Sequence, residues 1–476
     1  MGGGILLFLL GGVVAILSLV LLMLNGKEDL SIWHEVRLEK EFEAGSEVET
    51  FSQYLALEEE LFRELDEKIL SSDEVASGRM RYSPGSPANP SSYRVNWNRT
   101  FEWKPIGKAK GGVVLLHGMS DSPYSLRHIG KLLRDEGFHV IGLRLPGHGT
   151  APSGLKYFAW EDMESALNLT VRHLDEEIGE APLFLIGYSN GGALAVHYGC
   201  ESVRNDALPK VEGIVLCSPA VGVSPAAALA VWQRRLGHIL GMEKLAWTGV
   251  GPEYDPFKYV SFAVNAGVQV RDLTVEIRKD LAELKSQQLL GEYPSVLAFQ
   301  SIVDATVSTP ALIDVLFGEL PSNDHELVLF DINHRPGIDS ILKNDPFEAT
   351  KGLIESTAKT YSLSFVSNRK SEDEVVRVYH YAEDRGVAEM RAWEGNWPEG
   401  LYSLSHIAIP FPETDELYGS HPGDNKTGYH IGSVALRGER GALSISASDQ
   451  LRLRYNPFFP LLERRILERL GGGPFE

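Results

Sequence analysis

The sequence contains few cysteines and fewer basic than acidic residues. Only two cysteines, Cys200 and Cys217, occur among 476 residues, and each lies in an apolar run. Two buried thiols are therefore a simpler expectation than a disulfide. Lysine and arginine number 45 against 65 aspartate and glutamate residues, which gives a formal net charge of −20. Because such a charge repels phosphate backbones, we expect no nucleic-acid binding.

Sequence motifs that bind metals or nucleotides are also missing. The chain contains no H-E-x-x-H and no C-x-x-C, the short spacings that are typical of zinc sites. It contains neither the G-x-G-x-x-G loop of dinucleotide-binding proteins nor the G-x-x-x-x-G-K-[ST] phosphate loop. We therefore expect that the protein needs no metal and no cofactor.

One long apolar run lies near the N-terminus. Residues 5–24 carry no charge over twenty positions, a length that lets a helix cross ~30 Å of hydrocarbon. The segment lacks the basic start and the short apolar core of a cleaved signal peptide. It predicts a single-pass membrane anchor, and we expect the remaining chain to lie outside the cytoplasm, in the periplasm.

Composition divides the rest of the chain. After the anchor come acidic, helix-forming residues and then a stretch crowded with Pro, Ser and Asn, which predict a loosely packed stalk and an irregular linker. Farther on, strand-like and helix-like segments alternate, which predicts a parallel sheet with helices on both faces. The expected division is 1–26 anchor, 27–106 stalk and linker, 107–220 first part of the core, 221–292 helical cap, and 293–476 second part of the core with inserted antiparallel strands.

A serine between glycines follows one of the predicted buried strands. The residues Gly187-Tyr188-Ser189-Asn190-Gly191 connect the strand LFLIG to an apolar helix. A sharp strand-to-helix turn that exposes a serine needs a strained backbone and a close approach of strand and helix, which glycine tolerates. The G-x-S-x-G pattern alone arises by chance, but this placement favours a nucleophile over a merely tight turn.

Four stretches together resemble the α/β-hydrolase superfamily: HGMSDSPYSLR, LRLPGHGTAP, GYSNGGALA and FQSIVDATV. The resemblance covers roughly residues 112–333 and is nearest to monoglyceride lipases, lysophospholipases and serine aminopeptidase-like hydrolases, in a membrane-anchored bacterial type. It implies an α/β-hydrolase fold and a catalytic triad in the chain order nucleophile, acid, histidine.

The acid and the histidine of the triad are sought downstream of Ser189. Asp304 follows the strand PSVLAFQS and is the acid candidate, although it could instead only cap the next helix. His334 lies thirty residues farther, at the spacing of the family's simpler members. His406 follows about seventy residues of additional sequence, in a Ser-Leu-Ser-His context that resembles anchored bacterial hydrolases. We prefer His406 and keep His334 as the alternative base.

Two backbone amides are expected to stabilise an oxyanion. Asn190 begins the helix after the nucleophile, and Met119 lies in the loop after the first core strand. His117 and His148 lie in loops that the family uses as supports. The other histidines considered fall in predicted helices: His128, His173 and His197.

The predicted cap follows the strand VEGIVLCSPA and contains amphipathic stretches rich in aromatic residues. Such an excursion is expected to cover the site and to select the substrate. Six of its apolar residues could line an acyl pocket, although packing of the cap on the core is the simpler role for any one of them: Trp232, Leu236, Trp247, Phe257, Tyr259 and Phe262.

Together these features predict a membrane-anchored serine hydrolase that cleaves hydrophobic or lipid-derived carboxylic esters through an acyl-enzyme. Two alternatives remain open. An aminopeptidase-like serine peptidase would need an acidic pocket for the substrate amine. A non-catalytic binding protein could keep the same fold without a working histidine.

Overall fold

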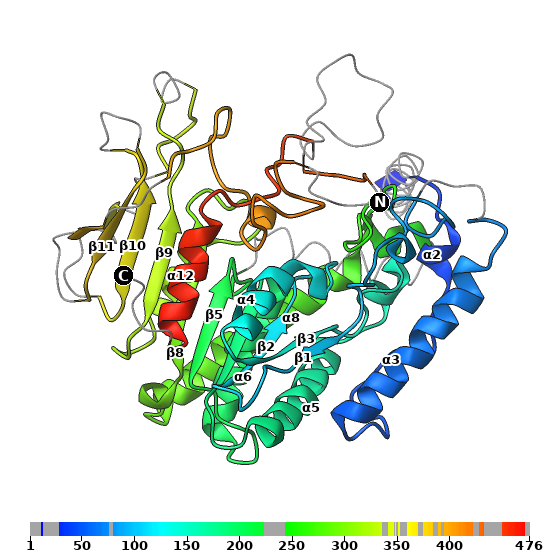
Figure 1. Cartoon of the computed structure of the whole chain (residues 1–476), viewed down its shortest axis with the longest axis horizontal. Helices are drawn as coiled ribbons and strands as arrows, with labels where there is room; N and C mark the ends of the chain where they lie inside the picture. Colours follow the sequence, from blue (N-terminus) through cyan, green and yellow to red (C-terminus); the bar gives the residue numbers. More distant parts are fainter. Residues whose placement is uncertain are drawn as a thin grey trace, which may run out of the picture.

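A large twisted sheet runs through the centre of the molecule (Figure 1). The computed structural model describes residues 11–12, 28–75, 80–222, 243–335, 341–346, 348, 351–352, 359–369, 375–383, 389–391, 395–421, 428–432 and 450–471. Within these ranges the sheet has ten strands in the order β1-β3-β2-β4-β5-β8-β9-β10-β11-β12. Their bounds are β1 (Phe101–Trp103), β2 (Gly112–Leu116), β3 (His139–Leu143), β4 (Leu183–Tyr188), β5 (Gly213–Cys217), β8 (Ser295–Ser301), β9 (Glu326–Phe330), β10 (Ser362–Ser367), β11 (Arg377–Tyr381) and β12 (Glu389–Arg391).

Most of the sheet is parallel. The strands from β3 to β10 in the sheet order pair in parallel, whereas β1 joins β3 in the antiparallel sense. The central strands are short apolar runs that are buried at nearly every position, as a parallel sheet covered on both faces requires. This arrangement confirms the predicted α/β architecture.

The extra strands at the far edge differ in part from the prediction of an antiparallel insertion. β11 and β12 are antiparallel to their neighbours. β10, however, pairs in parallel with β9 and extends the main sheet. The reason is the long connection between the two strands, which is sufficient for a crossover back to the same edge.

Helices cover both faces of the sheet. The helices are α2 (Ile32–Glu35), α3 (Phe51–Leu65), α4 (Arg127–Asp135), α5 (Trp160–Ile178), α6 (Asn190–Arg204), α8 (Val264–Ser286), α9 (Thr309–Leu312) and α12 (Phe459–Arg469). Shorter 3₁₀ and π-helical segments are η1 (Asp66–Leu70), η2 (Pro90–Ser92), η3 (Pro123–Leu126), η4 (Pro152–Lys156), η5 (Glu243–Ala246), η6 (Leu290–Glu292), η7 (Ile313–Phe317) and η8 (His406–Ala408). A small second sheet pairs β6 (Trp247–Gly249) with β7 (Phe262–Ala263).

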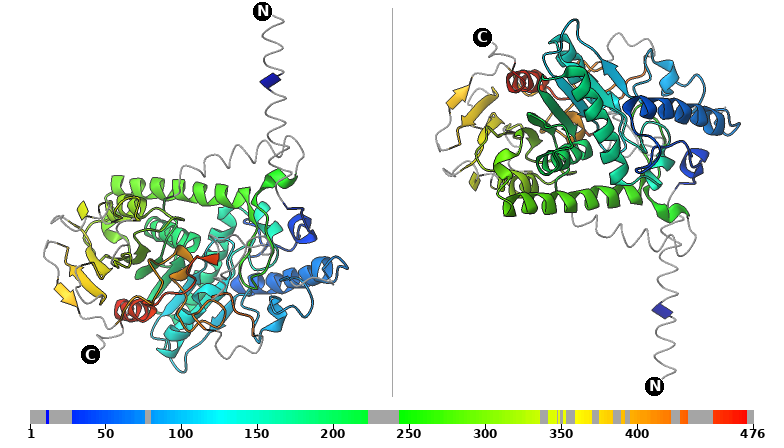
Figure 2. Two further views of the ribbon diagram at one scale, coloured as in Figure 1. Left: turned by 90° about the horizontal axis from the view of Figure 1, so that it is seen from above. Right: turned by 90° about the horizontal axis from the view of Figure 1, so that it is seen from below.

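Successive side chains of the strands point to opposite faces of the sheet and pack in two separate hydrophobic cores. Val114 and Leu116 pack with α5, α6 and α8, whereas Val113 and Leu115 pack with α4 and α12. Figure 2 shows α8 and α12 on opposite sides of the molecule. Both cysteines are buried and free, as predicted.

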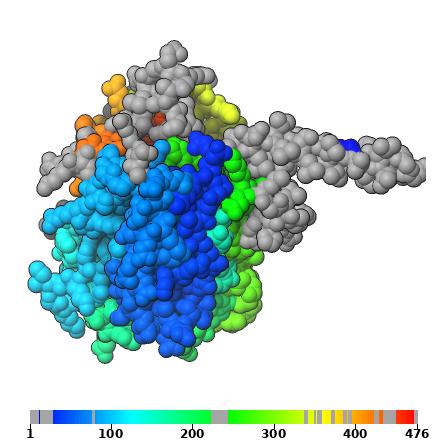
Figure 3. All heavy atoms as spheres, turned by 90° about the vertical axis from the view of Figure 1, so that its right-hand side faces the viewer, coloured from blue at the N-terminus to red at the C-terminus, as the bar shows by residue number. Residues whose placement is uncertain are grey.

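The segment predicted as a loosely packed stalk is instead part of the body. α3 buries one face, and Phe51 and Tyr54 join the core cluster that contains α5. The hydroxyl of Tyr54 donates to the carbonyl of Arg144 at 2.6 Å. Figure 3 shows residues of this N-terminal region spread over one side of the molecule. The helix packs on the body, contrary to the prediction, because apolar residues at helical spacing lie between its charged residues and form one buried face.

Two glutamates of the same region neutralise a buried arginine. The guanidinium of Arg144 is 1% exposed and bonds Glu41 at 2.9 Å and Glu58 at 3.0 Å. Glu58 also accepts hydrogen bonds from the amide and hydroxyl of Thr100. Because a buried cation without a counter-charge is strongly unfavourable, these ion pairs attach the N-terminal region to the core.

The predicted membrane anchor and periplasmic localisation are corrected. Among the described residues, no helix combines the length and the hydropathy needed to cross a bilayer. The segment 5–24 itself, apart from Gly11 and Gly12, falls outside those residues.

Glu58→Gln is expected to lower the free energy of unfolding by about 2 kcal/mol, because it removes one of two charges that balance a buried guanidinium. Glu59→Gln is the matched control, since Glu59 is 68% exposed and pairs with the half-buried Arg99. Urea denaturation of both variants measures the difference. Equal stability of the two variants would contradict the anchoring role.

Candidate active site

Ser189 lies at a strained turn where β4 ends and α6 begins. Its backbone has φ 54° and ψ −117°, a conformation that non-glycine residues rarely adopt. Two backbone hydrogen bonds hold it there: Ser189 donates to the carbonyl of Cys217 at 3.0 Å, and Ala220 donates to the carbonyl of Ser189 at 2.9 Å. The turn leaves the serine side chain at the carboxyl edge of the parallel sheet, where ligands bind in such folds.

The glycines around Ser189 are required by close packing. A Cβ atom on Gly187 would lie 2.4 Å from the carbonyl oxygen of Gly191. A Cβ atom on Gly191 would lie 2.1 Å from the carbonyl oxygen of Leu116, in the neighbouring strand. The strand and the helix can therefore meet at this turn only when both positions lack side chains.

Ser189, His406 and Asp304 are brought together across a long span of sequence. Nε2 of His406 lies 3.0 Å from Oγ of Ser189, and Nδ1 lies 2.8 Å from a carboxylate oxygen of Asp304. A carboxylate only accepts, so the pairing assigns the Nδ1–H tautomer, in which Nε2 accepts from the serine hydroxyl. This is the geometry in which a histidine acts as a general base toward a serine.

Asp304 is held as a carboxylate. Burial by itself would raise its pKa, but the hydrogen bond from His406 and the amides of Val307 and Thr306 outweigh burial and lower the pKa. The side chain is fully buried. The N-cap of α9 is Ser308, whose hydroxyl oxygen accepts from Ala311, so the alternative role of Asp304 as the cap of that helix is taken by another residue.

The loop that carries His406, residues 401–421 and here called the histidine loop, is fixed to the ends of two strands. Asn333, just after β9, donates its side-chain amide to the carbonyl of Leu401 and its backbone amide to the carbonyl of Tyr402, each at 2.7 Å. Ser301, the last residue of β8, donates its hydroxyl to the carbonyl of Leu404 at 3.0 Å. These bonds place His406 in front of Ser189.

His334, the alternative base, lies in a different network. Its Nε2 is 3.0 Å from a carboxylate oxygen of Asp331, and its backbone amide donates to Asn368. Ser367 donates to the same Asp331 carboxylate at 2.6 Å. The neighbouring residue, Asn333, holds the main chain of the histidine loop. In this chain, the position at which simpler family members carry the histidine therefore supports the histidine loop.

A buried carboxylate ties the histidine loop to the loop that follows β2. Asp415 accepts from Tyr124 in η3 and lies 2.9 Å from Arg127 and 3.0 Å from His128, both in α4. Burial would raise the pKa of Asp415, but the guanidinium of Arg127 and the bond to His128 lower it strongly. Sequence reasoning missed Asp415, because nothing in PETDELYG distinguishes it from a solvated acid.

The predicted oxyanion residues, Met119 and Asn190, line the same cavity as Ser189 and His406. Within the described part of the chain, neither backbone amide donates to a protein acceptor. Free amides of this kind suit a developing negative charge, especially at the N-terminus of α6.

The two histidines near these loops form hydrogen bonds that join β2 to β3. His117 accepts from the amide of Leu145 and bonds the carbonyl of Gly118. Nε2 of His148 lies 3.3 Å from the sulfur of Met119, and burial lowers the pKa of His148 to about 4. Both rings fit the supporting role expected for them.

The cavity at Ser189 has a volume of about 340 Å³. Of the six apolar residues expected to line an acyl pocket, Phe262 does so, whereas Trp247 and Phe257 are buried in the core. Tyr259 lines an adjoining cavity. The remaining two, Trp232 and Leu236, lie outside the described residues. The apolar walls at Ser189 come from other residues as well: Ala220, Val270, Val307 and Ile407.

The longest described element of the predicted cap is α8, which packs its length against the core cluster on one face of the sheet. Only its first turns, through Gly267 and Val270, reach the cavity. The role of residues 221–292 as a cap thus stays a prediction.

One cluster on this face offers metal-ligand atoms. The ligand atoms of His197, Glu201 and Asp280 lie within 4.8 Å of one another. However, Arg204 bonds both Glu201 and Asp280, and His197 lies 2.7 Å from Asp280. The positive charge that a metal would supply is already present, so the cluster is an ion-pair network between α6 and α8.

The mostly parallel sheet, the strained serine turn and the order of the three residues define the class: the chain has an α/β-hydrolase fold. More narrowly, residues 107–331, a little under half of the chain, match the family described as "Serine aminopeptidase, S33". The predicted fold is thereby confirmed.

Curated relatives share this region at low identity. "Phospholipase YtpA" of Bacillus subtilis is 30% identical over 122 residues, which are 23% of this chain and 41% of that protein. The match thus spans less than half of that relative's length. "Thermostable monoacylglycerol lipase" of Bacillus sp. is 23% identical over 217 residues, 46% of this chain and 79% of that protein.

A solved structure, a monoacylglycerol lipase of Paleococcus ferrophilus, is 22% identical with a TM-score of 0.37. The alignment covers 49% of this chain and 88% of that one. The family match and the two curated relatives support the lipase-like branch of the resemblance.

Asp415→Asn is expected to lower the free energy of unfolding by about 3–5 kcal/mol, because Arg127 would stay buried without its counter-charge. Hydrolysis of esters, the activity predicted from the sequence, should fall as well, since the histidine loop loses its attachment to α4. Glu416→Gln, at an exposed neighbouring position, is the matched control. Chemical denaturation and ester hydrolysis of both variants test this, and unchanged stability of Asp415→Asn would contradict it.

The His197 network predicts a pH dependence of stability. Burial would lower the pKa of His197, but the bonds to Asp280 and Glu164 raise it to about 9 from the ordinary 6.5. Because the pKa of His197 is higher in the folded than in the unfolded protein, its protonation stabilises the fold fully below pH 6.5, and this stabilisation is lost as the pH rises through about 9. The stability difference between wild type and His197→Gln, measured by urea denaturation, should therefore shrink over that interval; a constant difference would contradict the network.

Proposed function

We propose that the protein is a serine hydrolase that cleaves carboxylic esters through an acyl-enzyme formed on Ser189. The observation that carries the proposal is the pair of hydrogen bonds at His406, 3.0 Å to Ser189 and 2.8 Å to Asp304. A serine hydroxyl is a weak nucleophile by itself, and a histidine in this position can remove its proton during attack.

In the first step, Oγ of Ser189 attacks the ester carbonyl carbon while its proton moves to Nε2 of His406. The amides of Met119 and Asn190 stabilise the negative oxygen of the tetrahedral intermediate. The bond from carbon to the alcohol oxygen then breaks, and Nε2 returns the proton to the leaving alcohol. Asp304 keeps the ring oriented and stabilises the transient imidazolium.

In the second step, water attacks the acyl group on Ser189 with His406 again taking a proton. The carbon–oxygen bond to Ser189 breaks, its hydroxyl is restored and the carboxylic acid leaves. Every group that these steps require belongs to the chain, the substrate or water. The mechanism therefore uses neither metal nor cofactor.

The substrates that we propose are hydrophobic or lipid-derived esters. Support comes from the apolar walls beside Ser189, formed by Phe262, Val270 and Ile407. The two curated relatives, one named as a phospholipase and one as a monoacylglycerol lipase, also support lipid-derived substrates.

The peptidase alternative receives less support. An aminopeptidase needs a carboxylate to hold the substrate amine. Among the described residues, no aspartate or glutamate lines the cavity at Ser189, whereas Lys258 and Arg452 do. A free substrate amine would meet like charges there, so we favour an esterase over an aminopeptidase.

The test compares Ser189→Ala, His406→Gln and His334→Gln on p-nitrophenyl esters of several chain lengths and on aminoacyl anilides. We expect the first two variants to lose on the order of 10³-fold or more in kcat for esters, and His334→Gln to keep most of the wild-type rate. Anilides should be poor substrates throughout.

A fluorophosphonate probe should label wild type at Ser189 and leave Ser189→Ala unlabelled. Thermal unfolding of each variant serves as the folding control. Full ester turnover by a folded Ser189→Ala would overturn the proposal, and a larger loss in His334→Gln than in His406→Gln would reassign the base.

A further inference from the structure

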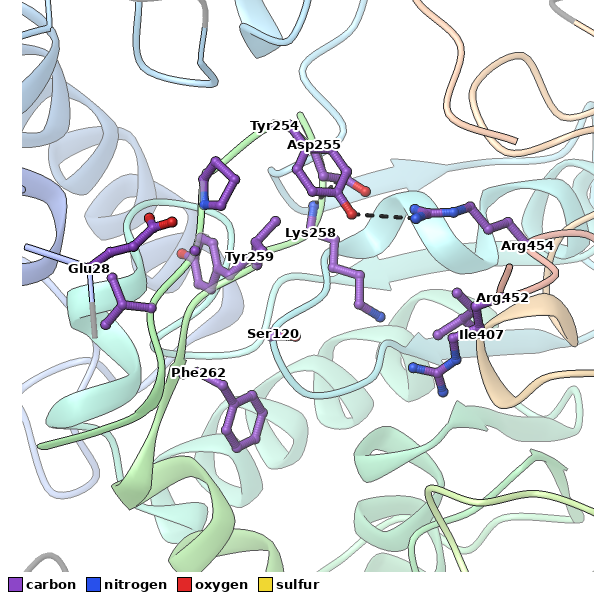
Figure 4. A pocket seen from close by; sticks show the side chains of 15 residues that line it. Glu28, Ser120, Tyr254, Asp255, Lys258, Tyr259, Phe262, Ile407, Arg452 and Arg454 are labelled. Atoms are coloured by element: carbon purple, nitrogen blue, oxygen red, sulfur yellow. Dashed lines mark hydrogen bonds between the residues drawn. The ribbon is translucent and has the colours of Figure 1, made fainter. Parts of the chain in front are cut away.

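A second cavity of about 420 Å³, whose lining Figure 4 shows, adjoins the cavity at Ser189. The two cavities share part of their lining, so the same side chains border both. The shared residues are Ser120, Lys258, Phe262, Ile407 and Arg452. Two of these five are cationic, although the whole chain carries a formal net charge of −20.

Arg452 is directed at the cavities without an acidic partner. Its guanidinium donates to the hydroxyl of Thr306 at 2.8 Å. In the part of the chain that the structure describes, Arg452 forms no ion pair, whereas Arg127 and Arg144 each bond buried carboxylates. An arginine that lines a cavity in this way has donors left for a ligand, and its planar fork suits carboxylate and phosphate oxygens.

Lys258 adds a second positive charge to the shared lining. Its nearest acidic neighbour is Asp121, at 3.9 Å, which is too long for a direct hydrogen bond. The lysine side chain is 30% exposed, so its ammonium group remains available to a ligand.

The acidic residues around the second cavity lie elsewhere or are already engaged. Asp255 accepts from the amides of Phe257 and Lys258 and from the hydroxyl of Tyr418. Figure 4 shows Glu28 at one side of the cavity, whereas Arg452 and Arg454 lie with Ile407 at the other. Arg454 donates to the hydroxyl of Tyr254 at 3.3 Å. The cationic side is therefore the one that adjoins Ser189.

We propose that the substrate ester carries an anionic oxygen group, a phosphate or a carboxylate, which Arg452 and Lys258 bind while the ester carbonyl lies at Ser189. This inference rests on the proposed function of Ser189 and narrows its substrate class. With a neutral ester, Arg452 keeps its bond to the hydroxyl of Thr306 and Lys258 its 3.9 Å ion pair with Asp121, whereas an anionic ester adds charge-assisted hydrogen bonds in a partly enclosed site. The preference is a matter of binding, so it should appear mainly in KM.

Two matched substrate pairs test the proposal and locate the charge. A monoacylglycerol and the 1-acylglycerol 3-phosphate with the same acyl chain differ only by a phosphate on the alcohol side. p-Nitrophenyl valerate and mono-p-nitrophenyl glutarate differ only by a carboxylate at the end of the acyl side. We expect wild type to prefer the anionic member in at least one pair, by about tenfold or more in kcat/KM.

The variants are Arg452→Gln and Lys258→Gln. Each should lower kcat/KM for the preferred anionic ester by about tenfold or more, through KM, and change the neutral ester by less than about threefold. Arg134→Gln and Lys279→Gln are matched controls, because each of these cations pairs with an acid of its own helix and lines neither cavity. Circular dichroism and fluorophosphonate labelling of Ser189 report that each variant is folded with an intact nucleophile.

Binding is also measured without turnover. Glycerol 3-phosphate and glutarate should slow the labelling of Ser189 in wild type and lose this effect in Arg452→Gln. Equal rates for neutral and anionic esters in both pairs, or an equal effect of Arg452→Gln on both members, would overturn the anionic subsite while leaving the esterase intact. Absence of both labelling and ester turnover in wild type would instead defeat the proposed function, and the subsite with it.

Discussion

The arrangement of the site depends on one constraint, the contact between His406 and Ser189. The two residues are 217 positions apart, and the serine is fixed by a strained turn that cannot move toward a partner. The histidine must therefore be delivered to it. Asn333 and Ser301 hold the histidine loop from the ends of β9 and β8, and Asp304, which follows Ser301, orients the ring. The site is thus assembled at one edge of the sheet by elements that are remote in sequence.

Buried ion pairs perform the attachment that apolar packing performs elsewhere. Arg144 joins the N-terminal region to β3 through Glu41 and Glu58, and Asp415 joins the histidine loop to α4 through Arg127. A buried pair adds little net stability compared with apolar residues, but breaking it is costly. These pairs therefore act chiefly by fixing where each segment docks. In an acidic chain, most carboxylates face solvent, and the few that meet a buried guanidinium determine the arrangement.

Local patterns in the sequence predicted much of the fold and part of the candidate site. The apolar run before Gly187 and the glycines around Ser189 are neighbours in the chain, and their spacing alone predicts a sharp turn. The base was ambiguous, because two histidines followed strand-like segments and spacing favoured His334. What separates them is the docking of the histidine loop by Asn333, a tertiary contact without a sequence signature. The prediction of a loosely packed stalk was wrong for the same reason. Nothing in the sequence distinguishes Glu41 and Glu58, which pair with Arg144, from the solvent-exposed acids of residues 27–75.

The pair of cations beside Ser189 is the feature that sequence patterns could least reveal. The aromatic residues after Cys217 predicted an apolar pocket, yet Trp247 and Phe257 are buried and pack in the core. Lys258 and Arg452 are 194 positions apart and line the same two cavities. The segment that carries Arg452 is bonded to the histidine loop, because the hydroxyl of Ser405 donates to the carbonyl of Leu453. The loop that brings His406 to Ser189 thus also contacts the segment that carries this cation. In this architecture the additional C-terminal residues would set both whether the serine reacts and which esters reach it.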